Sequence, residues 1–249
     1  DVVGMEEVNL VEKDHYFIRF RGNKTGLLGK SGWLVRPESD ADWIWPGSDG
    51  LFPAAKGGLS GFVNSSGAWV IEPRFSKVKK FSEQIGEYQN GTSSWGLLNS
   101  TGQLISSPEW EEVKPYISGK SIGKNSSGLF LLDKSGQKIN PTPYDQICRV
   151  HEGYFVIEKD GKRGLLNPDG IEVIAPEFDL IQFENKDFVL LGRGGKVGAV
   201  KDSGDVIFPM NYEAIVPDWS NGRILLKELY VPVVIPIEDS KNGKRKKGA

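Results

Sequence analysis

Short apolar runs alternate along the chain with glycine, proline and small polar residues. The densest runs cover residues 154–157, 188–191 and 224–226. Lighter runs, such as 69–71, 173–174 and 206–207, are followed by Pro73, Pro176 and Pro209. Proline has no amide hydrogen for a sheet ladder, so each proline predicts the end of a strand. No helical period lasts long enough to compete, and the pattern predicts an all-β fold with four short strands per unit.

One glycine recurs at intervals of 34 or 35 residues and defines that unit. We call its members the repeat glycines: Gly26, Gly61, Gly96, Gly164 and Gly198. Phe130 occupies the expected slot between the third and fourth of them. A period held through almost the whole chain indicates that one supersecondary unit has been copied.

Two further landmarks recur in each copy. A second glycine follows six residues after the first slot, and the residues between include Asn64, Asn99, Asp133 and Asn167. These residue types tolerate positive φ and predict a hairpin turn. An aromatic residue and an aliphatic residue three positions later come next, as in Phe75/Val78, Trp110/Val113, Tyr144/Ile147, Phe178/Ile181 and Tyr212/Ile215. We expect the third strand to begin there and the dense apolar run to form the fourth.

The two ends of the chain bear on whether the array closes. One more period places Pro232 in the slot of the repeat glycine, and the aromatic slot extends backward to Asp40 and Met5. The repeat-glycine slot and the aromatic slot then each occur seven times. The chain would start with the third and fourth strands of one unit and end with the first strand of another. Complementary ends can share a sheet and leave no unpaired edge. The sequence therefore predicts a seven-bladed β-propeller with its closing blade shared by the N- and C-termini, and an open β-solenoid is the alternative.

The repeat resembles the WG repeat family, which is found mainly in bacterial proteins. The resemblance lies in Trp95-Gly96, the trailing glycine, the apolar run, the proline, the aromatic residue and the aliphatic residue, and it extends from about Met5 to Ile235. Only one copy keeps the tryptophan, since Thr25, Ser60, Arg163 and Val197 precede the other repeat glycines. The resemblance implies a protein-interaction scaffold without a catalytic signature.

Composition and charge predict one domain with a basic end. The 249 residues carry a formal net charge of −2, which implies no general attraction to nucleic acid. We expect residues 1–238 to form a single WG-repeat propeller and residues 239–249 to form a basic disordered tail. The tail contains Lys241, Lys244, Arg245, Lys246 and Lys247, and it alone suits docking to nucleic acid or acidic lipid.

The sequence leaves the compartment open, with the periplasm, cell surface or exterior favoured over the cytoplasm. No apolar run approaches the ~20 residues of a transmembrane helix. The start at Asp1 to Gly4 resembles neither a signal peptide nor an initiator sequence and suggests a processed or excised end. The single cysteine, Cys148, excludes an intramolecular disulfide framework.

Candidate catalytic chemistry is sparse. His15 and His151 are the only histidines, and neither has the spacing of a metal site. Cys148 follows Ile147 on a predicted strand, so we interpret it as a buried thiol and not as a nucleophile activated by His151. Glu38, Asp40 and Asp42 alternate as calcium ligands would, but no calcium loop follows and a solvated acidic loop is favoured. We therefore predict no catalytic residue, no cofactor and no metal.

The tryptophans carry the functional hypothesis. Trp33, Trp69, Trp95 and Trp110 lie at repeat positions, and we expect them in the core between blades. Trp43, Trp45 and Trp219 fall in divergent segments, where exposed aromatic rings would form a recognition patch. We predict a non-enzymatic scaffold that binds another protein or a cell-surface component through its loops and axial face. The alternative is a propeller-type hydrolase or lyase that acts on a glycan or peptide.

Overall fold

The computed structural model describes residues 4–228, which form antiparallel β-strands, turns and one short 3-10 turn, η1 (His151–Gly153). The strands make six separate sheets. The prediction of an all-β repeat array is confirmed. Within residues 4–228 there is no helix with the length and apolar character needed to cross a membrane.

The first three sheets have four strands each, in sequence order. The first sheet contains β1 (Met5–Glu12), β2 (His15–Phe20), β3 (Lys24–Gly29) and β4 (Gly32–Ser39). The second contains β5 (Trp43–Ile44), β6 (Leu51–Lys56), β7 (Leu59–Asn64) and β8 (Trp69–Phe75). The third contains β9 (Lys77–Ser82), β10 (Ile85–Gln89), β11 (Trp95–Asn99) and β12 (Leu104–Trp110).

The last three sheets differ in strand number. The fourth has only β13 (Glu112–Val113), β14 (Ser121–Asn125) and β15 (Gly128–Leu132). The fifth contains β16 (Gln146–Arg149), β17 (Phe155–Lys159), β18 (Lys162–Leu166) and β19 (Glu172–Phe178). The sixth contains β20 (Leu180–Asn185), β21 (Phe188–Arg193), β22 (Lys196–Val200), β23 (Val206–Asp218) and β24 (Arg223–Glu228).

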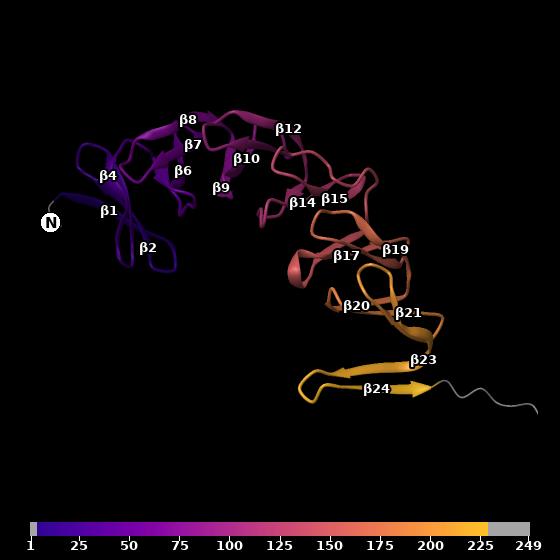
Figure 1. The fold of residues 1–249 in the computed structure, drawn as a ribbon. Helices are drawn as coiled ribbons and strands as arrows, with labels where there is room; N and C mark the ends of the chain where they lie inside the picture. The colour runs from indigo at the N-terminus through magenta and orange to yellow at the C-terminus, as the bar shows by residue number, and fades with distance from the viewer. Residues whose placement is uncertain (1–3, 229–249) are drawn as a thin grey trace, which may run out of the picture.

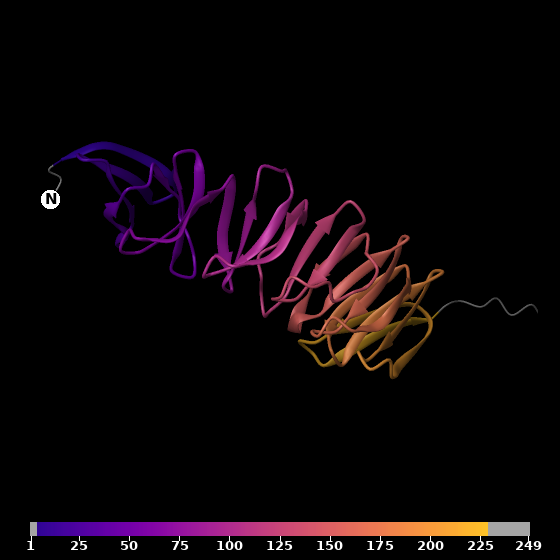
Figure 2. The ribbon, with the colours of Figure 1, turned by 90° about the horizontal axis from the view of Figure 1, so that it is seen from above.

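The sheets follow one another along an open arc (Figure 1). Strands β8, β12 and β19 lie on the convex side, and β9, β14 and β20 lie toward the concave side. Viewed from above, the sheets advance along the molecule instead of returning to the first one (Figure 2). The first and sixth sheets therefore lie at opposite ends, and no described strand belongs to both.

The described residues do not form the predicted closed ring, because the unit begins at a different strand. Each sheet starts with the strand that follows the aromatic slot, so β1 to β4 already complete a four-stranded sheet without help from the C-terminus. At the other end, β23 runs unbroken from Val206 to Asp218 and holds β24 on the sixth sheet. The predicted closing strand around Pro232 and the basic tail at 239–249 lie outside the described residues.

The repeat glycines are required by a close approach of two backbones. A Cβ on Gly61 would lie 2.3 Å from the carbonyl oxygen of Ile71, and one on Gly164 would lie 2.6 Å from that of Ile174. The partner strand shifts its register here, so its backbone passes over the glycine. The requirement is space and not a left-handed φ, since these glycines are absent from the positive-φ residues. The same carbonyl contact, at 2.9 to 3.0 Å, recurs at Gly26, Gly96 and Gly198.

The fourth sheet reverses this arrangement. Elsewhere a larger residue faces the repeat glycine across the ladder, as Ile157 faces Gly164. In the fourth sheet Phe130 stands in the glycine slot and faces Gly123. The large side chain leaves no room for a crossing strand, and the following segment makes only isolated bridges, Leu129 with Tyr144 and Leu132 with Lys138.

The predicted hairpin turns are confirmed, and they also join successive sheets. The Asn64 Oδ1 atom accepts bonds from the backbone N–H groups of Ser66 and Ala68 at 3.0 and 3.1 Å. Gly67 then has φ +88°, and a Cβ on it would lie 2.7 Å from the backbone nitrogen of Ser39 in the first sheet. The side chain of the turn residue repeats these bonds at Asn99, Asp133 and Asn167.

Apolar clusters fill the spaces between successive sheets, and they place the four repeat tryptophans differently. Trp110 is fully buried, as predicted, whereas Trp69 and Trp95 are half-buried. The core prediction is wrong for Trp33, which is 40% exposed. Trp33 occupies the position in the first sheet that Trp69 occupies in the second, opposite the next-to-last residue of the preceding strand. Trp69 is covered by the first sheet, and no described sheet precedes the first to cover Trp33.

Candidate binding groove

A groove opens between the second and third sheets beside β9, on the concave side of the arc (Figure 1). Its volume is about 660 Å³. We call it the Trp45–Trp95 groove after the two tryptophans that line it. The second sheet also contributes Pro46, Pro53, Ala55, Gly58 and Ser60, β9 and the residue before it contribute Ser76 to Lys80, and Glu12 reaches it from the first sheet.

The groove exists because the second sheet presents small side chains at this point. Ala55 of β6 pairs with Ser60 of β7 on the face that carries Phe62 toward the third sheet. Phe62 packs edge-on against Phe81 at a centroid distance of 4.7 Å and closes the deeper part of the interface. In the first and fifth sheets the pairs at the same place are larger, namely Arg19 with Thr25 and Glu158 with Arg163.

Trp45 lines one wall and belongs to a row of aromatic rings that continues away from the groove. Trp43 of β5 stacks on Phe17 at 4.4 Å with an interplanar angle of 23°, and Trp45 lies 6.4 Å from Trp43. The backbone N–H of Trp45 donates to the carbonyl of Pro53 at 2.8 Å, which fixes the segment that carries the ring. Trp45 nevertheless remains 40% exposed. The result is a rigid aromatic surface that is partly open to solvent.

Trp95 and Lys79 form the opposite wall. The Lys79 Nζ atom lies 4.1 Å from the centroid of the Trp95 ring, in the geometry of a cation–π contact. The same ammonium donates to the Glu87 carboxylate at 2.6 Å. Lys79 thus holds the Trp95 ring in place and has part of its charge neutralised.

Burial raises the pKa of the Glu87 carboxyl, and the attraction of Lys79 offsets this only in part. Glu87 and Glu112 both line a second, smaller cavity between the third and fourth sheets. The pKa of Glu112 is lowered because Lys114 donates a hydrogen bond to it. The pKa of the buried carboxyl next to Lys79 and that of the exposed carboxyl next to Lys114 are therefore displaced in opposite directions.

β9 is the edge strand of the third sheet and is bonded only to β10. Three of its six residues are lysines. Lys77 and Lys80 are exposed, and no carboxylate of residues 4–228 lies within ion-pair distance of either. The groove therefore combines an apolar wall, an open backbone edge and positive charge.

The comparisons with known proteins agree with this repeat architecture. Residues 61–91 and 95–122, which contain β8 to β13, match the WG containing repeat. These two adjacent segments are WG repeats. A comparison with curated proteins finds no match. A bacterial origin stays a prediction.

Solved structures that resemble this chain include β-propellers. The WD40 β-propeller domain of Doa1 is 13% identical, with 90% of this chain and 89% of that chain covered and a TM-score of 0.31. BamB from Moraxella catarrhalis is 11% identical, with 89% and 79% covered and a TM-score of 0.34. YCF48 bound to D1 peptide is 14% identical, with 90% and 91% covered and a TM-score of 0.32.

The array of sheets does not bring the three predicted site tryptophans together. Trp43 and Trp45 are neighbours at the second sheet, whereas Trp219 lies at the turn between β23 and β24 near the other end of the arc (Figure 1). The Trp219 Nε1 atom donates to Glu184 at 3.2 Å, and its ring meets Phe188 edge-on at 5.1 Å. Trp219 is 51% exposed and joins two successive repeats.

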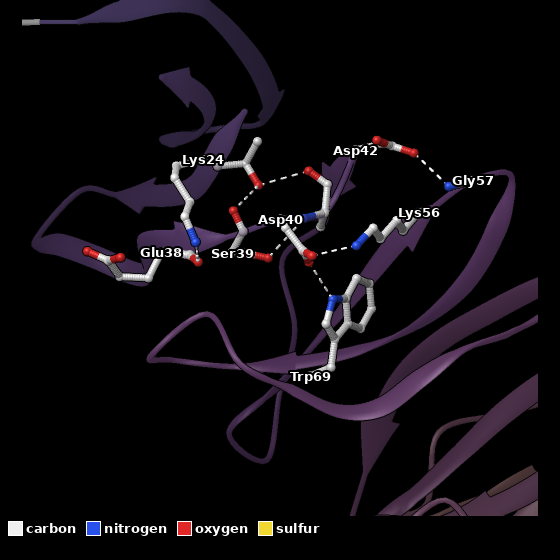
Figure 3. A network of polar contacts seen from close by, with 10 residues as sticks. Lys24, Glu38, Ser39, Asp40, Asp42, Lys56, Gly57 and Trp69 are labelled. Carbon is white, nitrogen blue, oxygen red and sulfur yellow. Dashed lines mark hydrogen bonds and ion pairs between the residues drawn. The ribbon is translucent and has the colours of Figure 1, made fainter. Parts of the chain in front are cut away.

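The divergent acidic segment joins the first two sheets (Figure 3). Asp40 accepts hydrogen bonds from Lys56 and from the Trp69 Nε1 atom, the latter at 2.7 Å, and the bond from Lys56 is the main cause of its lowered pKa. Asp42 accepts from the backbone N–H of Gly57 at 2.7 Å. Glu38 contributes its backbone carbonyl to Lys24 at 2.9 Å. The carboxylates of Asp40 and Asp42 are thus tied to a cation and to N–H groups, and residues 4–228 contain no cluster suited to a metal ion.

The alignment of this segment with the repeat also needs correction. Ser39, and not Asp40, occupies the place of Phe75, because Ser39 pairs with Thr25 as Phe75 pairs with Ser60. The aliphatic slot belongs to Ile44, which is fully buried, and not to Trp43. Asp40 and Ala41 are therefore extra residues in this connection, which the regular spacing of the glycines conceals.

The structure places the remaining candidates apart from the groove. His15 begins β2, and its Nδ1 atom lies 2.9 Å from the carbonyl of Lys13. His151 is exposed in η1. The prediction of a buried Cys148 is wrong, because Ile147 takes the core side of β16 and the next side chain must point outward.

Sequence reasoning missed Trp95 and the β9 lysines as members of the groove. Trp95 was assigned to the core because it precedes a repeat glycine. The other copies give no signal of exposure, because Thr25 and Ser60, which fill the same slot, are buried. Trp95 itself packs against the cluster between the third and fourth sheets and also lines the groove. Lys77, Lys79 and Lys80 line the groove next to it.

Proposed function

We propose that this chain is a non-enzymatic scaffold that binds another protein through the concave side of its array, with the Trp45–Trp95 groove as the principal site. The observation that carries the proposal is a fixed, partly exposed tryptophan wall beside an unpaired strand edge. A cell-surface component is the alternative partner.

Three properties support a binding role for the groove. Aromatic anchors contribute a large share of the energy at protein interfaces, and Trp45 and Trp95 are held in place before a partner arrives. A volume of about 660 Å³ is within the range of ligand sites. The open arc replaces the axial channel of a ring, so the concave side takes the role that we predicted for an axial face.

An affinity experiment with matched baits tests the proposal. The full chain and its Trp45→Ala and Trp219→Ala variants are immobilised and exposed to an extract of the native organism. We expect a protein that binds the full chain and the Trp219→Ala variant but not the Trp45→Ala variant. Equal recovery on all three baits, or recovery of glycan without protein, contradicts a protein-binding role for the groove.

A second candidate, a hydrolase that acts on a glycan or peptide, rests on Glu87 and Glu112. Two carboxyls with pKa values displaced in opposite directions line one cavity, which is the requirement for an acid and a base. The ion pair of Glu87 with Lys79 favours a structural role instead. Turnover of a glycan or peptide that is lost in Glu87→Gln would establish the hydrolase.

A further inference from the structure

We propose that the free edge of β9 accepts an extended acidic segment of a partner protein as an added β-strand, with one apolar side chain of that segment in the Trp45–Trp95 groove. This inference rests on the proposed function and specifies the chemistry of the partner.

The backbone of β9 provides the first argument. All strand-pairing bonds of this six-residue strand go to β10. The Phe81 carbonyl accepts a hydrogen bond from the Ser48 hydroxyl, whereas Lys77 to Lys80 have no second partner strand within residues 4–228. An edge strand of this kind is a template for a further strand. Ser76 and the first four residues of β9 line the groove, so a strand added there would lie along it.

Other concave edges are less suited to strand addition. β5 and β13 have two residues each, which is too short for a stable pairing. Next to β16, the Arg149 guanidinium donates to the carbonyls of Ile117 and Lys120 and occupies the space between the fourth and fifth sheets. β20 is an open edge strand of the same length, but the cavity beside it is smaller and is lined by the polar side chains of Arg149, His151 and Gln182. β9 combines length, an open edge and an adjoining groove with a mainly apolar surface.

Charge selects the partner. Lys77 and Lys80 are exposed and have no carboxylate of residues 4–228 in ion-pair range, while Glu12 is the one acidic residue that lines the groove. A segment with carboxylates on both sides of its apolar residue would therefore gain attraction over the whole strand. The same lysines repel the β9 edge of a second copy, so the partner is a different chain and not another copy of this one.

The apolar wall selects one anchoring side chain. Trp45, Pro53, Ala55 and Val78 surround the space on the second-sheet side of β9, and the pocket surface is mainly carbon. Successive side chains of an added strand point to opposite faces. One residue of the segment can therefore enter the groove while its neighbours face solvent and the lysines.

Synthetic peptides of about eight residues test the inference with the full chain, by fluorescence anisotropy. The first peptide has a central phenylalanine flanked by glutamates. The second replaces the glutamates with lysines, and the third is the acidic peptide with N-methyl groups on alternate backbone amides. We expect the first to bind and the other two to bind at least about tenfold more weakly, because they lose charge attraction and strand pairing respectively.

Variants of the chain locate the binding. Trp45→Ala should weaken the acidic peptide about thirtyfold, as expected for loss of a central anchor. Lys77→Glu with Lys80→Glu should reverse the preference between the acidic and basic peptides. The matched controls are Trp219→Ala and the pair Lys196→Glu with Lys201→Glu, which remove an exposed tryptophan and exposed lysines far from β9 and should leave binding unchanged.

Two outcomes overturn the inference. One is equal binding of the N-methylated peptide, which would show that no strand is added. The other is retained acidic binding by Lys77→Glu with Lys80→Glu when circular dichroism shows native strand content. Either result leaves the proposed function intact if capture of a protein still depends on Trp45. If no protein depends on Trp45 for capture, both the proposed function and the strand-addition inference are wrong.

Discussion

The fourth and fifth sheets are neighbours built from the same repeat, yet one has three strands and the other four. In the fifth, Gly164 lets the backbone near Ile174 pass directly over β18. In the fourth, Phe130 fills that place, and its cross-strand neighbour is Gly123. The comparison teaches that the repeat glycine controls the last strand of a sheet, and that a large residue is tolerated when the facing residue gives up its side chain.

The fourth sheet replaces the lost ladder with one polar side chain. Asn140 is buried, and its Oδ1 atom accepts a bond from the backbone N–H of Leu131 at 2.7 Å. Its amide nitrogen donates to the carbonyl of Thr142 at 2.6 Å. In the fifth sheet, the equivalent part of β18 pairs with β19. An amide side chain thus takes over a hydrogen bond that a strand makes elsewhere.

The largest effect is expected for Phe130→Ala. Phe130 is 4% exposed and packs against Trp110 between the third and fourth sheets, so its removal leaves a cavity. The free energy of unfolding should fall by about 4 kcal/mol in urea titrations. Adding Gly123→Ile should recover part of the loss, because it restores the size pairing seen at Ile157 and Gly164. If the losses in the free energy of unfolding from the two substitutions simply add, the large side chain at one position does not compensate for the small one at the other.

Gly164→Ala is the next test. The new Cβ would lie 2.6 Å from the Ile174 carbonyl oxygen and 2.8 Å from the Pro176 nitrogen, both of them backbone atoms. We expect a loss of about 3 kcal/mol in the free energy of unfolding, since β19 must move as a whole.

Gly123→Ala is the matched control for Gly164→Ala. Its Cβ would meet the Leu132 and Trp110 side chains at 2.7 Å, and a side chain can adjust where a strand cannot. The control should therefore lose less stability. A larger loss at Gly123 would mean that the backbone crossing is not what fixes the repeat glycine.

The same contrast explains how much of the fold the sequence could predict. The spacing of Gly61, Gly96 and Gly164 revealed the repeat and its turns because glycine there is a steric requirement. The boundaries of a sheet were not encoded in that spacing. Which strand begins a sheet depends on which strands pair, and the spacing of the glycines is the same whether the sheet begins before or after the aromatic slot. The predicted closure at Pro232 depended on the assumption that each sheet begins before the aromatic slot.

The groove was predictable only in part. Trp43 and Trp45 were identified because they depart from the repeat, and the structure places both at the second sheet. Trp95 was missed because it keeps the repeat, although its exposure depends on the small side chains of Ala55 and Ser60 in another unit. The exposure of a side chain that faces a neighbouring unit cannot be inferred from the sequence of its own unit alone.

A smaller effect is expected for Asn140→Ala. The change leaves the buried N–H of Leu131 without its acceptor, and the free energy of unfolding should fall by about 2 kcal/mol. Amide hydrogen exchange should accelerate at Leu131 but not at Leu165, its counterpart in the fifth sheet. Unchanged exchange at Leu131 would show that Asn140 does not substitute for the missing strand.

The smallest effect concerns the two carboxyls between the third and fourth sheets. Burial raises the pKa of Glu87 in the folded protein, so its contribution to stability is complete below the unfolded pKa and is lost as pH rises through the folded pKa. Lys114 lowers the pKa of Glu112, so the contribution of Glu112 is present above the unfolded pKa and is lost on acidification.

Glutamine variants at these two positions should therefore change stability with opposite dependence on pH. Relative to the unmodified chain, Glu87→Gln should gain stability between about pH 4 and pH 7, whereas Glu112→Gln should lose stability over the same interval. Urea titrations at several pH values measure both differences. The Glu112 effect should be the smaller because that ion pair is exposed to solvent, with side chains of Lys114 and Glu112 at 59% and 49% exposure. If the stability differences of both variants change with pH in the same direction, Glu87 and Glu112 do not differ in burial as described.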